Sequence, residues 1–258
     1  MRRLGSKWKD LGYLAYRWME PVFNPVRAAR AIPGYARFVR DWTRYRRMEG
    51  AEPTRLIDTY PLVDDATGTS RILRHYFHQD RWAFRKIHES GVTEHVDVGS
   101  RLDLLGFLSV ICRVTFIDIR PLTVPVENLE SRQGSILELP YPDQTVRSLS
   151  CLHVAEHIGL GRYGDALDPQ GTRKACAELA RVLAPGGNLY FSLPVGKPRL
   201  CFSAHRIHTP DQILGYFPSL DLVELSGVDD ENRFVRSIDP AVLRDSDYAC
   251  GLFHFTKR

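Results

Sequence analysis

Short apolar runs alternate with amphipathic segments from residue 94 onward. The apolar runs predict strands at 95–98, 114–118, 148–153, 188–193, 221–226 and 250–256. Between them, helical spacing of the apolar residues predicts helices at 102–111, 172–184 and 210–217. Apolar strands that alternate with helices indicate an α/β fold, with a doubly wound, mostly parallel sheet covered on both faces.

The N-terminal part of the chain has a different pattern. Residues 1–50 carry aromatic side chains at mostly helical spacings among Lys and Arg, and Pro21, Pro25 and Pro33 predict two or three short helices. A further helix is predicted over 70–91. We therefore expect a basic, aromatic-rich helical extension over 1–50 and a Rossmann-like domain over 51–258.

The charge of the chain follows the same division. Of 35 Lys and Arg against 31 Asp and Glu, residues 1–50 hold 12 basic and 4 acidic side chains, so the rest of the chain is slightly acidic. Two interpretations of the extension stay open: a segment that packs its aromatic rings on the domain, which we favour, or a module with weak contact to a membrane surface. We do not expect a nucleic-acid partner, and the oligomeric state is not predicted.

The cysteines and the apolar runs bear on location. The five cysteines are scattered without a C-x-x-C pair, which indicates reduced thiols and neither a disulfide framework nor a zinc site. No apolar run approaches the roughly 18 residues of a membrane-spanning helix. The basic N-terminus is interrupted by charged residues, so a secretory signal is not expected. These features predict a cytoplasmic protein.

The first predicted strand and turn, HVDVGSR at 95–101, indicate a nucleotide-cofactor site. Gly99 lies where the chain turns sharply and a ligand can approach bare backbone, and Asp118 ends the next strand, where an acid can bind ribose hydroxyls. The turn lacks the three glycines that a dinucleotide diphosphate requires. S-adenosylmethionine has a ribose but no phosphate, so Ser100 and Arg101 are compatible with it, and Arg101 can face its carboxylate.

The second half of the chain resembles class I S-adenosylmethionine-dependent methyltransferases. The resemblance lies in LPYPDQTVRSLSCLHVAEH at 139–157 and in LARVLAPGG at 179–187, followed at once by an apolar strand. More narrowly, HVDVGSR, EHIGLGRYGD and GGNLYFSLPVG followed by AHR resemble an uncharacterised methyltransferase-like domain of unknown function. That family was first noted in nematodes, and its bacterial members tend to occur near surface-polysaccharide genes.

The resemblance, which covers about residues 70–258, implies S-adenosylmethionine as cofactor and an antiparallel last strand. It places Asp97 and Gly99 near the methionine part of the cofactor and Asp118 on the ribose. Ser135 and Ile136 fall near the adenine, although the family often has an Asp where this chain has Ser135.

Polar side chains crowd the segment after the fourth predicted strand. His153 and Glu156 are candidates for cofactor binding, and His157 is a candidate general base because the ordinary pKa of imidazole lies near neutrality. Asp165 is expected to orient cofactor or acceptor, and His205 to bind the acceptor. HVAEH also has the order of a zinc-peptidase motif, but it begins at a strand end, so no metal is predicted.

These features favour a methyltransferase acting on an oxygen of a saccharide or related polar metabolite. An NAD-dependent oxidoreductase or epimerase is the first alternative, disfavoured by the missing glycines. An inactive cofactor-binding scaffold is the second alternative.

Overall fold

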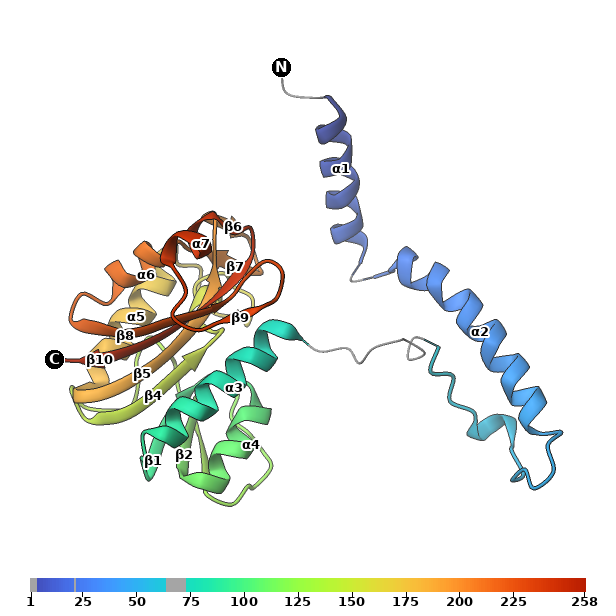
Figure 1. Ribbon diagram of the computed structural model, residues 1–258, viewed down its shortest axis with the longest axis horizontal. Helices are drawn as coiled ribbons and strands as arrows, with labels where there is room; N and C mark the ends of the chain where they lie inside the picture. Colours follow the sequence, from blue (N-terminus) through green and yellow to red (C-terminus); the bar gives the residue numbers. More distant parts are fainter. Residues whose placement is uncertain (1–3, 21, 64–72) are drawn as a thin grey trace. The chain divides into compact units, whose positions relative to one another are not determined.

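The computed structural model describes residues 4–20, 22–63 and 73–258, with 4–10, 14 and 30 described by their helical backbone alone. The chain forms two compact units, Met1–Arg71 and Ile72–Arg258 (Figure 1). The division falls later than the predicted boundary at 50, because residues 51–63 pack along a helix of the first unit. The first residues of the helix predicted over 70–91 lie outside the described residues.

The first unit contains α1 (Leu4–Met19), α2 (Pro25–Tyr45) and the short 3-10 helix η1 (Leu56–Asp58). The side chain of Asn24 caps α2, and Pro25 occupies its first turn. Of the two or three short helices predicted, the described residues of this unit form two α-helices, and α2 continues through Pro33. The Arg37 side chain donates a hydrogen bond to the Val63 carbonyl (3.2 Å), which ties residues 51–63 to this helix.

The second unit is built on one large sheet with strand order β3-β2-β1-β4-β5-β10-β8-β9. Its strands are β1 (Glu94–Val98), β2 (Arg113–Asp118), β3 (Leu129–Gln133), β4 (Val146–Leu152), β5 (Leu183–Val195), β8 (Leu220–Val228), β9 (Phe234–Val235) and β10 (Ala249–Lys257). β1 to β5 pair in parallel, whereas β10 is antiparallel to both β5 and β8. The predicted doubly wound, mostly parallel sheet with an antiparallel last strand is confirmed.

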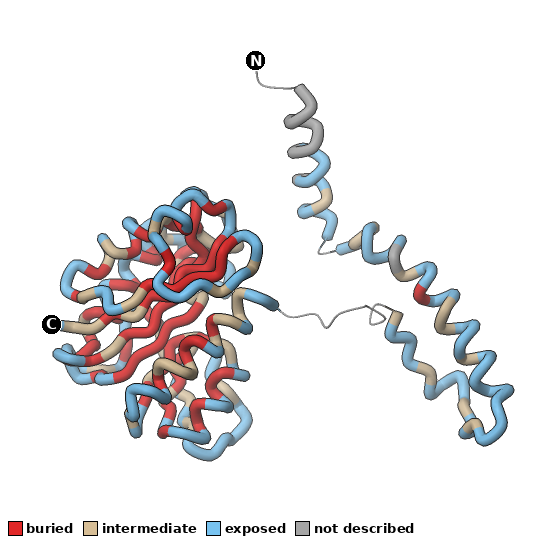
Figure 2. Tube along the Cα trace, viewed as in Figure 1, coloured by how far each residue is buried: buried red, intermediate tan, exposed pale blue. Residues whose placement is uncertain are grey.

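Helices cover both faces of the sheet, and the buried residues follow the strands between them (Figure 2). α3 (Arg74–Glu89) and α4 (Leu102–Ile111) pack on one face, and α5 (Gly171–Val182), α6 (Pro210–Tyr216) and α7 (Pro240–Asp245) pack on the other. A short hairpin, β6 (Arg199–Cys201) and β7 (His205–Ile207), and the 3-10 helix η2 (Ala155–His157) complete the unit. The chain changes direction across the sheet between β1 and β4, so a ligand site is expected at the carboxyl ends of these two strands.

Candidate functional site

The turn after β1 leaves bare backbone at the switch point. Gly99 has φ +70°, a conformation that other residues adopt at a cost, and its N–H donates to the Ile117 carbonyl of β2 (3.0 Å). A Cβ on Gly99 would lie 3.0 Å from a methyl group of Val154 and 3.6 Å from Oδ2 of Asp118. The glycine therefore keeps open the space between the ends of β1, β2 and β4.

Asp97 and Ser100 stabilise this turn through hydrogen bonds. The buried Asp97 carboxylate accepts hydrogen bonds from the Ser100 N–H (3.0 Å) and the Ser150 hydroxyl, and Ser100 Oγ accepts one from the Leu152 N–H (3.1 Å). Burial raises the pKa of Asp97 to about 6, although the hydrogen bonds from Ser150 and Ser100 oppose this shift. The structure thus gives Asp97 and Ser100 a role in shaping the turn, behind the cavity wall.

A cavity of about 90 Å³ lies beside Gly99 at the strand ends. Asp118 ends β2 at its wall, where one carboxylate oxygen accepts a hydrogen bond from the Arg120 N–H (2.7 Å) and the other faces Gly99. Tyr163 also lines the cavity, and its ring lies under the guanidinium groups of Arg120 (4.7 Å) and Arg162 (5.1 Å). Small-molecule sites usually measure about 300–1,000 Å³, so this cavity is smaller than a cofactor site usually is.

The two residues predicted near the adenine separate in the structure. Ile136 is buried and lines the cavity, as an apolar wall for a ring system would. Ser135 does not line the cavity, and its hydroxyl accepts a hydrogen bond from the Leu137 N–H (3.1 Å). The turn that follows β3 therefore uses the Ser135 side chain for its own backbone.

His153 stands at the end of β4 in a left-handed conformation (φ 56°) that is uncommon for a residue with a side chain. Its Nδ1 hydrogen-bonds to Oε1 of the buried Gln79 from α3, and since an amide oxygen only accepts, Nδ1 carries the proton. Nε2 is then the accepting nitrogen, and it is buried without a hydrogen-bond partner among the described residues. Burial lowers the pKa of His153 to about 3, which keeps the ring neutral.

Glu156 and His157 occupy η2, directly behind His153. The Glu156 side chain is buried, neither of its oxygens has a hydrogen-bond partner among the described residues, and burial raises its pKa to about 8. His157 lines the cavity, its Nδ1 donates to the Ala204 carbonyl (2.5 Å), and its Nε2 lies 3.6 Å from Glu156. Burial also lowers the pKa of His157 to about 4. An unpartnered buried carboxyl is costly unless a ligand completes it.

The remaining predicted residues lie farther from the cavity wall. Asp165 accepts hydrogen bonds from the N–H groups of Gly159 (2.6 Å) and Tyr163 (3.3 Å), so its carboxylate holds the backbone of the loop that carries Tyr163. Arg101 pairs with Asp103 (2.5 Å) and lies over the ring of Tyr76 (5.1 Å), and it does not line the cavity.

A second, larger cavity of about 680 Å³ shares His153 with the first. Most of the residues that line it were not predicted as site residues, and they come from the start of α3 and from the segments that flank β9 and β10. The rings of His75 and Tyr248 stack at its wall (5.4 Å, 19°), and the His205 ring lies near Tyr248 in a tilted arrangement (5.4 Å between centroids, 46°). Arg74, Asp230, Asn232 and Asp247 supply polar groups. No local sequence signal marks these residues, because only the folded sheet brings them together.

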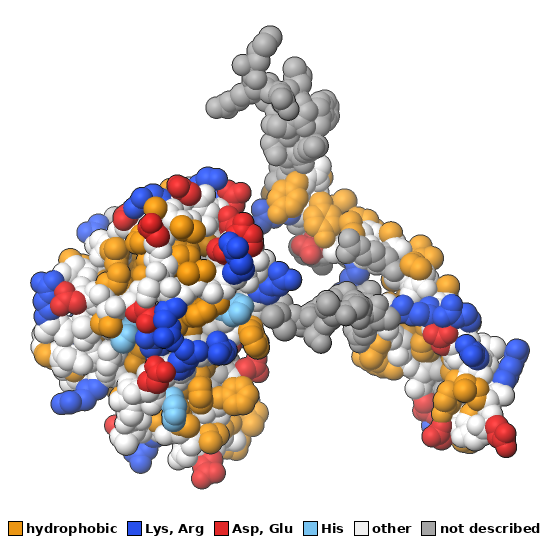
Figure 3. All heavy atoms as spheres, viewed as in Figure 1, with side chains coloured by type: hydrophobic (Ala, Val, Ile, Leu, Met, Phe, Trp, Pro, Cys, Tyr) orange, Lys and Arg blue, Asp and Glu red, His pale blue; other side chains and the backbone are white. Residues whose placement is uncertain are grey.

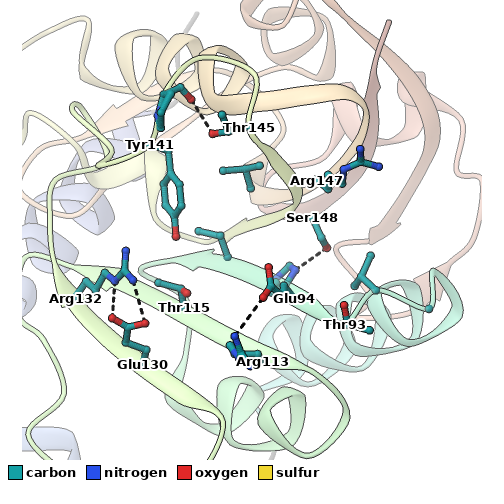
Figure 4. Close-up of a pocket in the computed structure, with 16 residues that line it drawn as sticks. Thr93, Glu94, Arg113, Thr115, Glu130, Arg132, Tyr141, Thr145, Arg147 and Ser148 are labelled. Carbon is teal, nitrogen blue, oxygen red and sulfur yellow. Dashed lines mark hydrogen bonds and ion pairs between the residues drawn. The ribbon is translucent and has the colours of Figure 1, made fainter.

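A hollow of about 740 Å³ lies at the opposite, amino-terminal edge of the sheet (Figure 4). Four of its charged groups form pairs, Glu94 with Arg113 (3.4 Å) and Glu130 with Arg132 (2.7 Å), and Arg147 also lines it. It is the larger space, but it lacks the unpartnered buried groups found at the carboxyl ends of the strands. We therefore place the functional site at the switch point.

The fold is that of known methyltransferases. The N-methyltransferase NodS from Bradyrhizobium japonicum, solved with S-adenosyl-L-homocysteine, superimposes with a TM-score of 0.50 at 15% identity, over 76% of this chain and 91% of its own. A candidate methyltransferase in complex with a Haloferax volcanii methyltransferase activator gives 0.51 at 15% identity, over 71% and 90%. The chain has a class I methyltransferase fold. The [4+2]-cyclase SpnF shares this fold (TM-score 0.52, 16% identity, 69% and 81% covered).

The sequence comparisons are narrower. Residues 143–236 match the family described as a Caenorhabditis protein of unknown function, DUF268, in line with the resemblance drawn from the sequence. No curated protein matches the chain. Within the described residues, no cluster of three or more His, Cys, Asp and Glu side chains is arranged to hold a metal ion. Among the same residues, no helix is both long and apolar enough to cross a membrane.

Proposed function

We propose that this protein is an S-adenosylmethionine-dependent methyltransferase that methylates a hydroxyl of a saccharide or related polar metabolite. One observation carries the proposal. The side-chain-free backbone of Gly99 lies beside Oδ2 of Asp118, at the switch point of a sheet with a methyltransferase fold. A Cβ at this glycine would fill the space, and the turn offers no row of glycines to a diphosphate, which disfavours NAD.

S-adenosylmethionine supplies an electrophilic methyl group. Asp118 would accept hydrogen bonds from the ribose hydroxyls, and Ile136 would pack on the adenine. Glu156 would hold the ammonium group, since a bound cation favours the ionised form of a buried carboxyl. Movement of the Tyr163 loop would enlarge the cavity for the cofactor.

The cavity that shares His153 suits a saccharide acceptor. Stacked aromatic rings such as His75 and Tyr248 offer an apolar face to a sugar ring, and carboxylates and an amide accept bonds from hydroxyls. We assign the role of general base to His153, ahead of His157, because the Nε2 lone pair of His153 is unpartnered whereas that of His157 faces Glu156. The His205 ring contacts Tyr248, so His205 would lie near an acceptor bound against Tyr248.

The test is methyl transfer from S-adenosylmethionine labelled in the methyl group to a panel of saccharides and methyl glycosides. We expect label in a saccharide ether, and His153→Ala should slow transfer by about 10²–10⁴-fold with the affinity for S-adenosylmethionine retained. His88→Ala, at an exposed position of α3, serves as the matched control. Transfer only to nitrogen acceptors would contradict the saccharide assignment, and full activity of His153→Ala would contradict its role.

A further inference from the structure

Helix α2 of the first unit carries an apolar stripe that the unit does not cover. Ile32, Tyr35 and Val39 recur at spacings of three and four residues, so they share one side of the helix. Their exposed fractions are 70%, 52% and 55%. A soluble helix normally buries such a stripe, so this one requires an explanation.

The rest of the unit packs elsewhere on α2. Val63 sits against Gly34, where a Cβ would meet it at 2.6 Å, and the Trp42 ring N–H donates to the Thr54 hydroxyl (3.0 Å). Residues 51–63 therefore contact α2 at Gly34 and at Trp42, and they leave Ile32, Tyr35 and Val39 exposed. More large apolar side chains of the unit are also exposed, namely Leu11, Tyr13, Trp18, Met19, Val22, Phe23, Val26, Leu56, Ile57, Tyr60 and Leu62.

Basic side chains accompany this apolar surface. Arg37, Arg40 and Arg44 also follow one another at spacings of three and four residues. Their mean direction is about 140° around the helix axis from that of the stripe. Residues 1–50 as a whole hold 12 basic against 4 acidic side chains. Hydrophobic and basic side chains lie next to one another along this part of the chain (Figure 3).

We infer that the first unit binds an anionic lipid surface, with α2 lying in the plane of the interface. Its apolar stripe would enter the boundary of headgroups and acyl chains, and the basic charge of the unit would be attracted to the anionic surface. Charge complementarity favours this partner over a second copy, because two copies of so basic a segment repel each other. The inference does not depend on the proposed activity.

The test is co-sedimentation of the full chain with vesicles of phosphatidylcholine containing phosphatidylserine, and with vesicles of phosphatidylcholine alone. We expect sedimentation with the anionic vesicles only. Raising the salt from about 0.1 M to about 1 M should release the protein, since the screening length falls from about 10 Å to about 3 Å.

Two variants separate the contributions of the stripe and the charge. Replacing Ile32, Tyr35 and Val39 together by Gln, a good helix former, should leave the protein in the supernatant. The double change Arg40→Gln and Arg44→Gln should weaken binding by about 25-fold, at about fivefold per arginine. The matched controls change exposed residues of the second unit. Replacing Leu102, Phe107 and Val110 together by Gln is the control for the stripe, and replacing Arg147 and Arg173 by Gln is the control for the charge.

Three results would overturn the inference. A wild-type chain that stays in the supernatant with anionic vesicles at low salt would contradict the inference directly. A triple variant that converts a dimer into a monomer would assign the stripe to a second copy. A triple variant that lowers the melting temperature of the full chain, without any vesicle binding by the wild type, would assign the stripe to packing on the second unit.

Discussion

Glu156 is a buried carboxyl group in the candidate site whose hydrogen bonds are not made by the described residues. Its carboxyl is buried, it lies 3.6 Å from His157 Nε2, and neither oxygen has a hydrogen-bond partner among the described residues. Burial raises its pKa to about 8. Glu156 is therefore protonated in the folded chain at neutral pH. In the unfolded chain its pKa is the ordinary value of about 4.3, so there it has lost the proton.

This difference predicts a pH dependence of stability. Between about pH 4.3 and pH 8 the folded state binds one more proton at Glu156, so the free energy of unfolding falls by about 1.4 kcal/mol per pH unit from this group. Glu156→Gln removes the effect. Denaturant unfolding between pH 6.5 and 8, above the ordinary pKa of histidine, should show the variant gaining on the wild type as pH rises.

The matched control is Glu94→Gln, which changes an exposed carboxylate paired with Arg113. Its difference from the wild type should stay constant over the same range. A constant difference for Glu156→Gln would show that Glu156 is ionised in the folded protein, and its assignment as a buried neutral acid would be wrong.

At the scale of elements, helix α3 supplies part of the site although it precedes the first strand of the sheet. Gln79 of α3 fixes the proton on His153 Nδ1, and Lys86 pairs with Glu224 of β8 (2.7 Å). Burial alone would raise the pKa of Glu224, but hydrogen bonds from Lys86, Ser226 and Trp82 outweigh burial and lower the pKa to about 2. The pair ties α3, and with it Gln79, to the sheet.

Glu224→Gln should lower the free energy of unfolding by about 1–2 kcal/mol at pH 7, a figure reduced for partial solvent screening. The lowered pKa means that this stability is present above about pH 4.3 and is lost as the pH falls toward 2. The difference between variant and wild type, followed by chemical unfolding, should therefore shrink across that range. Glu130→Gln on the exposed edge strand is the control, and an equal effect there would contradict the anchoring role.

The sequence predicted the elements better than it predicted the site. Apolar runs identified the buried strands, because a sheet covered on both faces requires apolar residues at most positions. β3 (LESRQ) was not predicted as a strand, since it is a polar edge strand without that pattern. Gly99 and Asp118 could be found because each directly follows or ends a strand. Gln79 and Tyr248 could not, because tertiary packing alone brings them to His153.

At the scale of the whole molecule, the sheet order places every proposed cofactor contact at one edge. The fold alone does not decide the reaction, since SpnF, a [4+2]-cyclase, shares it with the N-methyltransferase NodS. The alternatives differ in the cofactor that is bound and in whether a methyl group is transferred. A methyltransferase binds S-adenosylmethionine, an oxidoreductase or epimerase binds NAD, and an inactive scaffold binds cofactor without transferring a methyl group.

Thermal unfolding with S-adenosylmethionine or NAD, for the wild type and Asp118→Ala, tests the central claim most directly. S-adenosylmethionine at about 100 times its dissociation constant should stabilise the wild type by about 2.7 kcal/mol, whereas NAD should leave it unchanged. Asp118→Ala should remove most of that gain, because the ribose loses a charged hydrogen-bond acceptor. Stabilisation by NAD and not by S-adenosylmethionine, or an undiminished response in Asp118→Ala, would contradict the account.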